Sequence, residues 1–225
     1  GLIAMTNISS AVLLFSTCMV VLFIGRVPLK FIAMLLIIGG FAGMIAFQFG
    51  QRGGTAVSRV EAFFGDEIPY QAQQGYAAIA TGGLFGKGPG QSDQRNFLPS
   101  AYSDFIYAII IEEYGLVGGI IVIFLYLGLL YRGMKATTHS ETAYGGLLVS
   151  GLVFSIIFQA MINIGVTLGL GPITGVTLPL LSMGGTSQLF FGIAIGMILS
   201  VTQGELSPYP MGVKGNQSKN FERVA

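Results

Sequence analysis

Residues 105–131 read FIYAIIIEEYGLVGGIIVIFLYLGLLY, and the only charged side chains among them are Glu112 and Glu113. A helix of roughly 20 apolar residues crosses the hydrocarbon core of a bilayer, which is about 30 Å thick. This stretch is long enough to do so and predicts a membrane-spanning helix. The composition agrees, because 52% of the 225 residues are hydrophobic, only 9% are charged and the mean hydropathy is +0.74. Soluble domains carry about 25% charged residues, so we expect an integral membrane protein.

Four further apolar runs have the length of a membrane span or nearly so. They lie at residues 8–24, 31–50, 143–166 and 186–203. We therefore predict an all-α polytopic membrane protein with about five transmembrane helices within residues 1–203, followed by a tail at 204–225.

The basic residues of the short linkers predict which side each linker occupies. Arg26 and Lys30 lie between the first two spans, Arg132 and Lys135 between the third and fourth, and three more in the tail, so seven of the eleven Lys and Arg residues share one side. The positive-inside rule makes this side cytoplasmic. The long loop 51–104 and the segment 167–185 are then extracytoplasmic. The same basic residues form no stripe of the kind that binds nucleic acid.

The extracytoplasmic loop contains GGLFGKGPGQS at residues 82–92, which invites a nucleotide-binding interpretation. A P-loop requires G-x-x-x-x-G-K-[ST], but Lys87 is followed by glycine and Thr81 stands five positions before Gly86. The nucleotide interpretation therefore fails. The preceding YQAQQGYAAIATGG predicts a short amphipathic helix that ends at residues 82–83.

Four basic residues run against the positive-inside tendency in this loop. They are either solvated or positioned to clamp a diphosphate, for which the guanidinium fork of arginine is suited. These residues are Arg52, Arg59, Lys87 and Arg95.

The second extracytoplasmic segment reads GLGPITGVTLPLLSMGGTSQ at residues 169–188 and is apolar but interrupted by prolines and glycines. Irregular backbone at membrane depth survives only where protein buries it or water reaches it. We interpret it as a re-entrant turn that leads to an anion-receiving helix start at residues 182–187. A helix start with Thr186 or Ser187 as its N-cap is an equally good interpretation.

Three acidic residues lie at the start of the 105–131 stretch or within it. Asp104 stands where a helix N-cap would favour a carboxylate, so it has a structural explanation as well as a functional one. Glu112 and Glu113 would lie about 12 to 13 Å deeper along a continuous helix, near the bilayer midplane. Acids at that depth are paired or functional, and we expect these two to be structural. One cysteine, Cys18, and one histidine, His139, cannot build a metal site, which leaves a carboxylate-only site open.

Two long stretches resemble a known family. YQAQQGYAAIATGGLFGKGPGQSDQRNFLPSAYSDFIYAIIIEEYG at residues 70–115, with Arg59 before it, and NIGVTLGLGPITGVTLPLLSMGGTSQ at 163–188 resemble the SEDS (shape, elongation, division, sporulation) family of cell-wall proteins, which includes FtsW and RodA. The overall likeness is nearer to FtsW. Members have about ten helices, so the resemblance implies a C-terminal half. A chain that begins at Gly1 rather than methionine fits that expectation, and we expect the half-chain alone to be inactive.

The resemblance implies a peptidoglycan glycosyltransferase of the bacterial cytoplasmic membrane, with its active site on the extracytoplasmic face. Such an enzyme polymerises lipid II by inverting glycosyl transfer, with loss of undecaprenyl diphosphate. Asp104 matches the family's catalytic aspartate and becomes the candidate base. Mg²⁺ or Mn²⁺ is a possible cofactor, although the sequence shows no cage for it. The candidate substrate-binding residues are Arg59, Tyr70, Gln71, Gln74, Lys87, Ser92, Arg95, Ser182, Gly184, Gly185, Thr186 and Ser187.

The implied partners are lipid II, the growing undecaprenyl-diphosphate glycan, a class B penicillin-binding protein transpeptidase, other division or elongation proteins and membrane lipids. Two other functions stay open. A lipid II flippase would line a path across the bilayer with polar residues, and a scaffold for the transpeptidase would have dispensable charges in its extracytoplasmic loop. The sequence does not decide between a role in division and one in elongation.

Overall fold

Residues 8–49, 53–65, 68–98, 102–140 and 142–206 are described by a computed structural model. Every regular element within these ranges is a helix, which confirms the predicted fold class. In chain order the helices are α2 (Ile8–Ile24), α3 (Leu29–Phe49), α4 (Gly53–Phe64), α5 (Tyr70–Gly82), the 3₁₀ helix η1 (Gln94–Asn96), α6 (Ile106–His139), α7 (Ala143–Thr167) and α8 (Gly185–Leu206).

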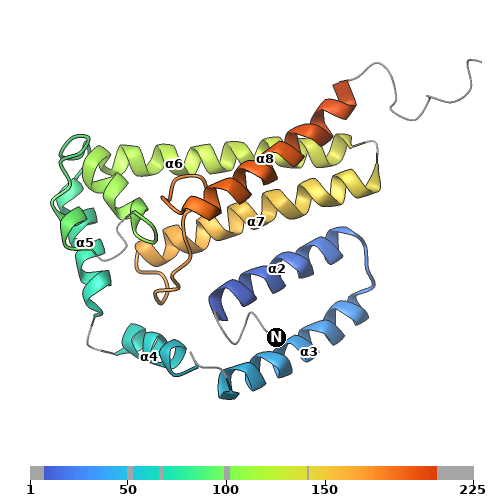
Figure 1. Cartoon of the computed structure of the whole chain (residues 1–225), viewed down its shortest axis with the longest axis horizontal. Coiled ribbons are helices and arrows are strands. Elements are labelled where there is room, and N and C mark those ends of the chain that lie inside the picture. The colour runs from blue at the N-terminus through green and yellow to red at the C-terminus, as the bar shows by residue number, and fades with distance from the viewer. Residues whose placement is uncertain (1–7, 50–52, 66–67, 99–101, 141, 207–225) are drawn as a thin grey trace, which may run out of the picture.

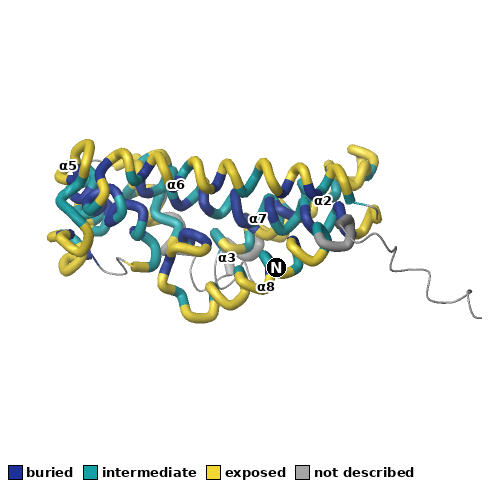
Figure 2. The backbone as a smooth tube through the Cα atoms, turned by 90° about the horizontal axis from the view of Figure 1, so that it is seen from above, coloured by how far each residue is buried: buried dark blue, intermediate teal, exposed yellow. Residues whose placement is uncertain are grey.

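Helix α7 occupies the centre of the bundle and contacts α2, α6 and α8 (Figure 1). Its buried side chains, among them Val149, Val153 and Ile156, join Tyr126 of α6 and Ile198 of α8 in one apolar core. Seen from above, buried residues follow the α6–α7 interface while the outer side of α6 is exposed (Figure 2). Helix α3 contacts chiefly α2 and α4, and most of its described side chains are exposed. The centre of the bundle therefore lies on α7.

In the part of the chain that the structure describes, three helices are long and apolar enough to cross a membrane, namely α6, α7 and α8. Helices α2 and α3 occupy the predicted runs at 8–24 and 31–50 and form shorter apolar helices over the described part. The short helix predicted to end at residues 82–83 is present as α5. Helix α4, within the long loop 51–104, was not predicted.

The expectation of one continuous helix over 105–131 was wrong at one point. Gly115 has φ 72° and ψ −173°, so α6 consists of a short first part, residues 106–114, and a long second part, residues 116–139. At 1.5 Å per residue the second part is about 36 Å long and can span a bilayer by itself. The depth inferred for Glu112 from a continuous helix therefore no longer holds.

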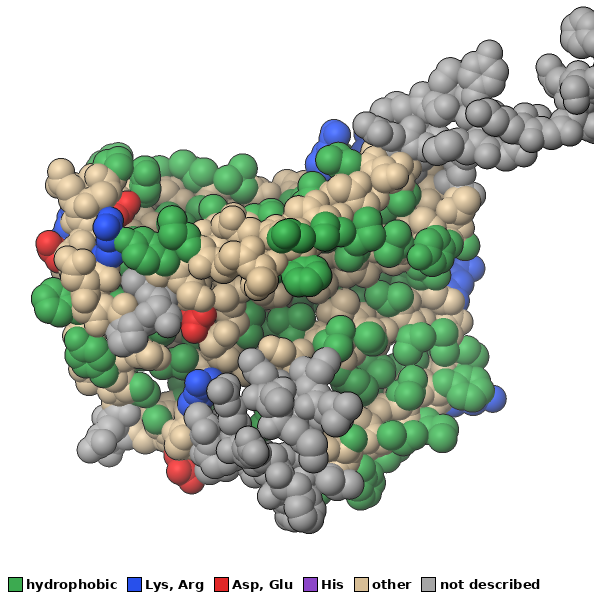
Figure 3. Space-filling model, in the orientation of Figure 1, with side chains coloured by type: hydrophobic (Ala, Val, Ile, Leu, Met, Phe, Trp, Pro, Cys, Tyr) green, Lys and Arg blue, Asp and Glu red, His purple; other side chains and the backbone are tan. Residues whose placement is uncertain are grey.

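The linkers gather at two ends of the bundle, as the charge pattern predicts. Figure 1 shows the α2–α3 and α6–α7 connections at one end, and α5 with the α7–α8 connection at the other. On the face that Figure 3 shows, hydrophobic side chains are spread along the bundle, and most of the charged side chains lie towards its ends. The candidate residues of the long loop and of the re-entrant segment thus share one end of the molecule.

Candidate functional site

The glycine-rich turn lies against the break in α6 and completes its hydrogen bonding. The amides of Lys87 and Gly88 donate to the carbonyls of Glu112 (2.9 Å) and Glu113 (3.0 Å), which lie in the last turn before the break. In return the amide of Leu116, which begins the second part of α6, donates to the carbonyl of Gly83 (2.9 Å). Helix ends leave such groups without partners inside the helix. The turn therefore allows an interrupted helix to be buried in a membrane protein.

Glycine is required where the two backbones touch. A Cβ at Gly86 would lie 2.2 Å from the carbonyl oxygen of Glu113, and a Cβ at Gly115 would lie 2.2 Å from that of Leu84. Both residues also have positive φ, 78° and 72°. Only glycine meets both conditions without strain. The glycines of this stretch hold another segment of the same chain and need no bound phosphate to explain them.

Polar groups of the turn converge on the carboxylate of Glu112, which is fully buried. The ammonium of Lys87 donates to Oε1 at 2.8 Å, and the Ser92 hydroxyl donates to Oε2. The backbone amide of Asp93 (3.2 Å) and the hydroxyl of Thr81 (3.4 Å) also donate to Oε1. A buried charge is tolerated only when it is paired and hydrogen-bonded. We call Glu112, Lys87, Ser92, Asp93 and Thr81 the Glu112 cluster, and it fastens the turn to α6 as the sequence analysis expected of a structural acid.

Two candidate substrate-binding residues, Lys87 and Ser92, belong to this cluster. Lys87 also pairs with the exposed Asp93 at 2.9 Å, and its hydrogen bonds to Glu112 and Asp93 raise the pKa of its ammonium above the ordinary value. The Ser92 side chain is buried and also accepts from the Arg95 amide at 3.1 Å. The guanidinium of Arg95 is exposed, 5.3 Å from the ring centre of Tyr102. Their substrate role stays a prediction, and the contacts observed here are within the chain.

Asp104 lies just before α6 and is half-buried. Within the described residues, the only hydrogen-bond donor to its carboxylate is the hydroxyl of its neighbour Ser103, at 3.0 Å from Oδ1. The other oxygen, Oδ2, faces Gly175 of the α7–α8 connection, where an added Cβ would lie 3.6 Å away. The next residue, Phe105, is buried against Leu98, Ile109 and Ile173. The segment that carries Asp104 is thus anchored, and Oδ2 has no hydrogen-bond donor among the described residues. We call the side of Oδ2 the open side of Asp104.

Ser182 is buried before the start of α8. Its side chain is 3% exposed, its hydroxyl donates to the carbonyl of Ser103 at 2.6 Å, and it accepts from the Leu178 amide at 2.8 Å. A direct contact with substrate was predicted for this residue, and the observed contacts instead join the α7–α8 connection to the segment that carries Asp104.

The other residues of the predicted anion-receiving helix start lie around the first turn of α8. Gly184 is half-buried and Ser187 partly exposed, whereas Gly185 and Thr186 are exposed. The helix begins at Gly185, so Thr186 and Ser187 lie inside its first turn and neither stands in the N-cap position. The amide of Gln188 already donates to the carbonyl of Gly184 at 2.9 Å. The alternative N-cap interpretation was therefore wrong, and the anion site stays a prediction.

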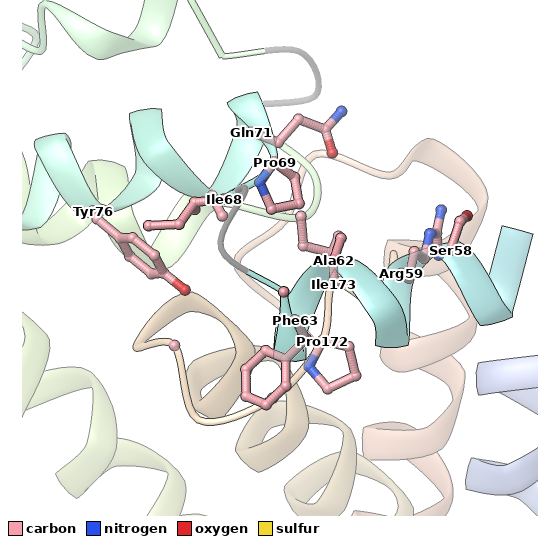
Figure 4. A pocket seen from close by; sticks show the side chains of 14 residues that line it. Ser58, Arg59, Ala62, Phe63, Ile68, Pro69, Gln71, Tyr76, Pro172 and Ile173 are labelled. Atoms are coloured by element: carbon pink, nitrogen blue, oxygen red, sulfur yellow. The ribbon is translucent and has the colours of Figure 1, made fainter.

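A cavity of about 580 Å³ opens between α4, α5 and the α7–α8 connection. Figure 4 shows Arg59 and Ser58 on α4 at one side, Gln71 at the start of α5, and the apolar side chains of Phe63 and Pro172 in the lower part of the view. The wall is mostly apolar and Arg59 provides its cation. Because Gly171, Pro172 and Ile173 line the cavity and Gly175 faces Asp104, a single connection borders both.

Of the remaining candidates on α5, Gln71 lines this cavity. Tyr70 is exposed at the first position of the helix, and Gln74 is half-buried one turn further. Neither borders the cavity as the structure defines it. Arg52 lies outside the described residues.

The described residues contain no group of three or more His, Cys, Asp and Glu side chains able to hold a metal ion. Glu112 is committed to its own cluster. A divalent cation bound at Asp104 would have to take most of its oxygen ligands from substrate and water. Mg²⁺ or Mn²⁺ as a cofactor stays a prediction.

Comparison with known proteins identifies the family. The sequence profile of the FtsW/RodA/SpoVE family, described as "Cell cycle protein", matches residues 1–206. The chain belongs to this family. Stage V sporulation protein E of Bacillus subtilis (strain 168) is 35% identical over 205 residues, which cover 88% of this chain and 55% of the relative. The probable peptidoglycan glycosyltransferase FtsW of Enterococcus hirae is 42% identical over 134 residues, 59% of this chain and 34% of the relative.

A solved structure of the same family agrees with the fold. It is described as "Structural coordination of polymerization and crosslinking by a peptidoglycan synthase complex", and the match has a TM-score of 0.66 at 25% identity, over 88% of this chain and 56% of that chain. The chain thus spans about half the length of the family members that it matches over most of its own length. Family membership and three helices long enough to span a bilayer make it a multi-pass membrane protein.

One residue that the sequence analysis did not single out as a site residue, Asn163, contacts the Asp104 segment. Its side-chain amide donates to the carbonyls of Asp104 and Val176, each at 2.7 Å. The available signal was a buried amide within the apolar run of α7, since polar groups inside a membrane span are paired or functional. No pattern in the sequence predicts its two partners, which lie 59 and 13 residues away in the chain.

Proposed function

We propose that this chain forms the C-terminal part of a peptidoglycan glycosyltransferase that polymerises glycan strands from lipid II. One observation carries the proposal. Asp104 is an anchored carboxylate with one open side, and it borders the same connection as an apolar cavity whose cation is Arg59. A reaction between two lipid-linked sugars needs a base, a cation near the leaving group and an apolar surface for the lipid.

In the proposed reaction Asp104 acts as general base. The 4-hydroxyl oxygen of the acceptor's N-acetylglucosamine forms a bond to C1 of the donor's N-acetylmuramic acid. The bond between C1 and the phosphate oxygen breaks, the hydroxyl proton passes to the carboxylate, and undecaprenyl diphosphate departs with the electron pair. General-base catalysis of this kind contributes about 10²- to 10⁴-fold. The open oxygen Oδ2 of Asp104 is the proposed proton acceptor.

Arg59 would offset the charge that builds on the departing diphosphate. A guanidinium holds phosphate oxygens in a fork of two hydrogen bonds, and charge stabilisation of a leaving group acts where the charge develops. The cavity beside Arg59 has an apolar wall of Ala62, Phe63, Ile68 and Pro172, which suits the first isoprene units of the lipid. Gln71 lies on the same wall and would donate to a phosphate or sugar oxygen.

The site would face the extracytoplasmic side of a bacterial cytoplasmic membrane. The basic linkers at the opposite end of the bundle support this orientation. A class B penicillin-binding protein transpeptidase is the proposed partner, because the matching solved structure is described as a complex that couples polymerization and crosslinking.

The test is polymerisation of labelled lipid II by the full-length protein that carries this chain, purified in detergent with its partner. We expect wild type and Asp93→Asn to form glycan polymer, and Asp104→Asn to form about 10²-fold less or none at equal abundance. Asp93 is the matched control because it is an exposed aspartate at the same end of the molecule. Full polymerisation by Asp104→Asn would contradict the assignment of the base.

The same assay separates the proposed function from its alternatives. A flippase needs two compartments, so polymer formed in detergent excludes transport as the sole activity. A scaffold would yield no polymer from any version of the protein when the partner's own synthetic activity is blocked.

A further inference from the structure

Three consecutive carbonyl groups before α6 accept hydrogen bonds from α7 and from the α7–α8 connection. The carbonyl of Tyr102 accepts from the Met183 amide (2.9 Å), that of Ser103 from the Ser182 hydroxyl (2.6 Å), and that of Asp104 from the Asn163 side-chain amide (2.7 Å). The first turn of α6 uses none of them, since the amides of Ala108 and Ile109 both donate to the carbonyl of Phe105. The backbone that carries the candidate base is therefore held by tertiary contacts.

Among these donors, Asn163 contacts both the segment that carries Asp104 and the α7–α8 connection. Its two amide hydrogens go to the carbonyls of Asp104 and Val176, each at 2.7 Å, and its side chain is 2% exposed. Among the described residues its oxygen Oδ1 has no partner. Both partners are acceptors, so the position requires an NH₂ group; a carboxylate would repel both and a hydroxyl would satisfy one.

The two carbonyls held by Asn163 border the open side of Asp104. One belongs to Asp104 itself, and the other follows Gly175, the residue that faces Oδ2. Ser182 makes a second connection between the same two segments, because it contacts both Ser103 and Leu178. The distance between the carboxylate and the wall opposite it is thus set by two buried side chains.

We propose that Asn163 and Ser182 are positioning residues that fix the carboxylate of Asp104 relative to the α7–α8 connection, where the reacting hydroxyl must enter. This proposal rests on the proposed function, because it concerns the base of that reaction. Neither side chain touches substrate, and both act through the backbone of residues 103 and 104. A displacement of about 1 Å in a reacting group can cost about 10²-fold in rate.

The test compares Asn163→Ala with Gln159→Ala in the full-length protein. Gln159 is the matched control because it lies one turn earlier on α7 and its side-chain amide donates to the Thr177 carbonyl of the same connection at 3.0 Å, but it does not reach the Asp104 segment. We expect Asn163→Ala to lower kcat for lipid II polymerisation by about 30- to 100-fold with KM changed by less than about twofold. Gln159→Ala should retain kcat within about threefold.

A second pair of measurements distinguishes positioning from stability. Ser182→Ala should lower kcat as Asn163→Ala does. Ser182→Thr keeps the hydroxyl, so the logarithm of its kcat should lie at least about halfway from the Ser182→Ala value to the wild-type value. In the slower Asp104→Glu background, Asn163→Ala should cost much less than in wild type, because contacting residues that act as a unit give non-additive effects.

Each other outcome has a defined meaning. Equal kcat losses for Asn163→Ala and Gln159→Ala would overturn the positioning proposal while Asp104→Asn remains inactive and the proposed function stands. Failure of both Asn163→Ala and Ser182→Ala to fold, with Gln159→Ala folded, would also overturn it, since the contacts would then serve the fold alone. Full activity of Asp104→Asn would contradict the proposed function first.

Discussion

Two carboxylates on the same chain segment, Glu112 and Asp104, are eight residues apart and have opposite surroundings. Glu112 is fully buried and accepts from four groups of the Glu112 cluster. Asp104 is half-buried and accepts from one hydroxyl within the described residues, while its backbone, rather than its carboxylate, holds the tertiary contacts. One acid is held by its side chain and the other by its main chain.

The difference separates an acid that maintains the fold from one that is able to react. A carboxylate with both oxygens occupied has no position for a substrate hydroxyl. An anchored backbone with an open oxygen provides a fixed base, and fixed geometry is what makes general-base catalysis efficient. Sequence alone ranks the two acids differently, because a carboxylate inside an apolar run looks more unusual than one at a helix start.

The largest expected effect is on folding when the Glu112 side chain is removed. Glu112→Ala leaves a buried cavity, and it leaves the Ser92 hydroxyl and the Asp93 amide without their acceptor. We expect membrane abundance of the full-length protein to fall by about fivefold or more, measured by quantitative immunoblotting. Asp104→Asn should keep wild-type abundance. Normal abundance of Glu112→Ala together with lost polymerisation would reverse the comparison and make Glu112 the reacting acid.

Next in size is a loss of polymerisation when the open side of Asp104 is narrowed. Gly175 has φ 68° and faces Oδ2, so Gly175→Ala both strains the backbone and fills the approach to the carboxylate. We expect kcat/KM for lipid II to fall by about 10- to 100-fold.

Gly90→Ala is the matched control for this change. Gly90 has φ 77° and no heavy atom within 4 Å of an added Cβ, so the variant carries similar strain in open space. It should keep kcat/KM within about twofold. Equal losses in the two variants would show that strain alone lowers activity and that Gly175 leaves no functional opening.

Much of the fold follows from the sequence because apolar length is a strong signal. The runs at 8–24 and 143–166 became helices with nearly the expected ends. The break at Gly115 was missed, since the stretch around it is long and mostly apolar and glycine is common in membrane helices. The break exists because the turn 83–88 supplies hydrogen bonds from 25 to 33 residues away, and no local pattern records such a partner.

In the candidate site, too, the sequence identified residues but not their distant partners. Asp104 could be selected from its motif, and Arg59 was found beside a cavity. The sequence alone predicted that Lys87 binds a phosphate, because a sequence does not show which group a lysine pairs with. A lysine near glycines fits a phosphate and a buried glutamate equally well until the fold places Glu112 at 2.8 Å from its ammonium. Asn163 was missed because its role depends on two carbonyls, and backbone groups carry no residue identity.

A smaller effect is expected when Lys87 loses its charge. Lys87→Met removes the ion pair with Glu112 and keeps the aliphatic stem, so we expect the unfolding temperature to fall by about 3 to 6 °C, measured by thermal unfolding in detergent. Polymerisation per folded molecule should stay within about twofold. A severe loss of polymerisation at unchanged unfolding temperature would instead support the diphosphate role first considered for Lys87.

The stability that the charge of Lys87 contributes should be lost only at high pH. Hydrogen bonds to Glu112 and then Asp93 raise the pKa of Lys87 above its ordinary value. A raised folded pKa gives stability that is complete below the pKa of unfolded lysine, about 10.4, and is lost as the pH rises through the folded value. The gap in unfolding temperature between wild type and Lys87→Met should therefore be constant from about pH 6 to about pH 9.

The smallest effect is expected at Asp93, an exposed carboxylate beside the Glu112 cluster's lysine. Its side chain is 75% exposed and pairs with Lys87 at 2.9 Å, while its backbone amide donates to Glu112. Asp93→Asn keeps that amide and removes only an exposed ion pair, and such pairs contribute little to stability. We expect the unfolding temperature to change by less than about 2 °C, with polymerisation equal to wild type. A shift as large as that of Lys87→Met would mean that the pairing with Asp93, rather than the burial of Glu112, fastens the turn to α6.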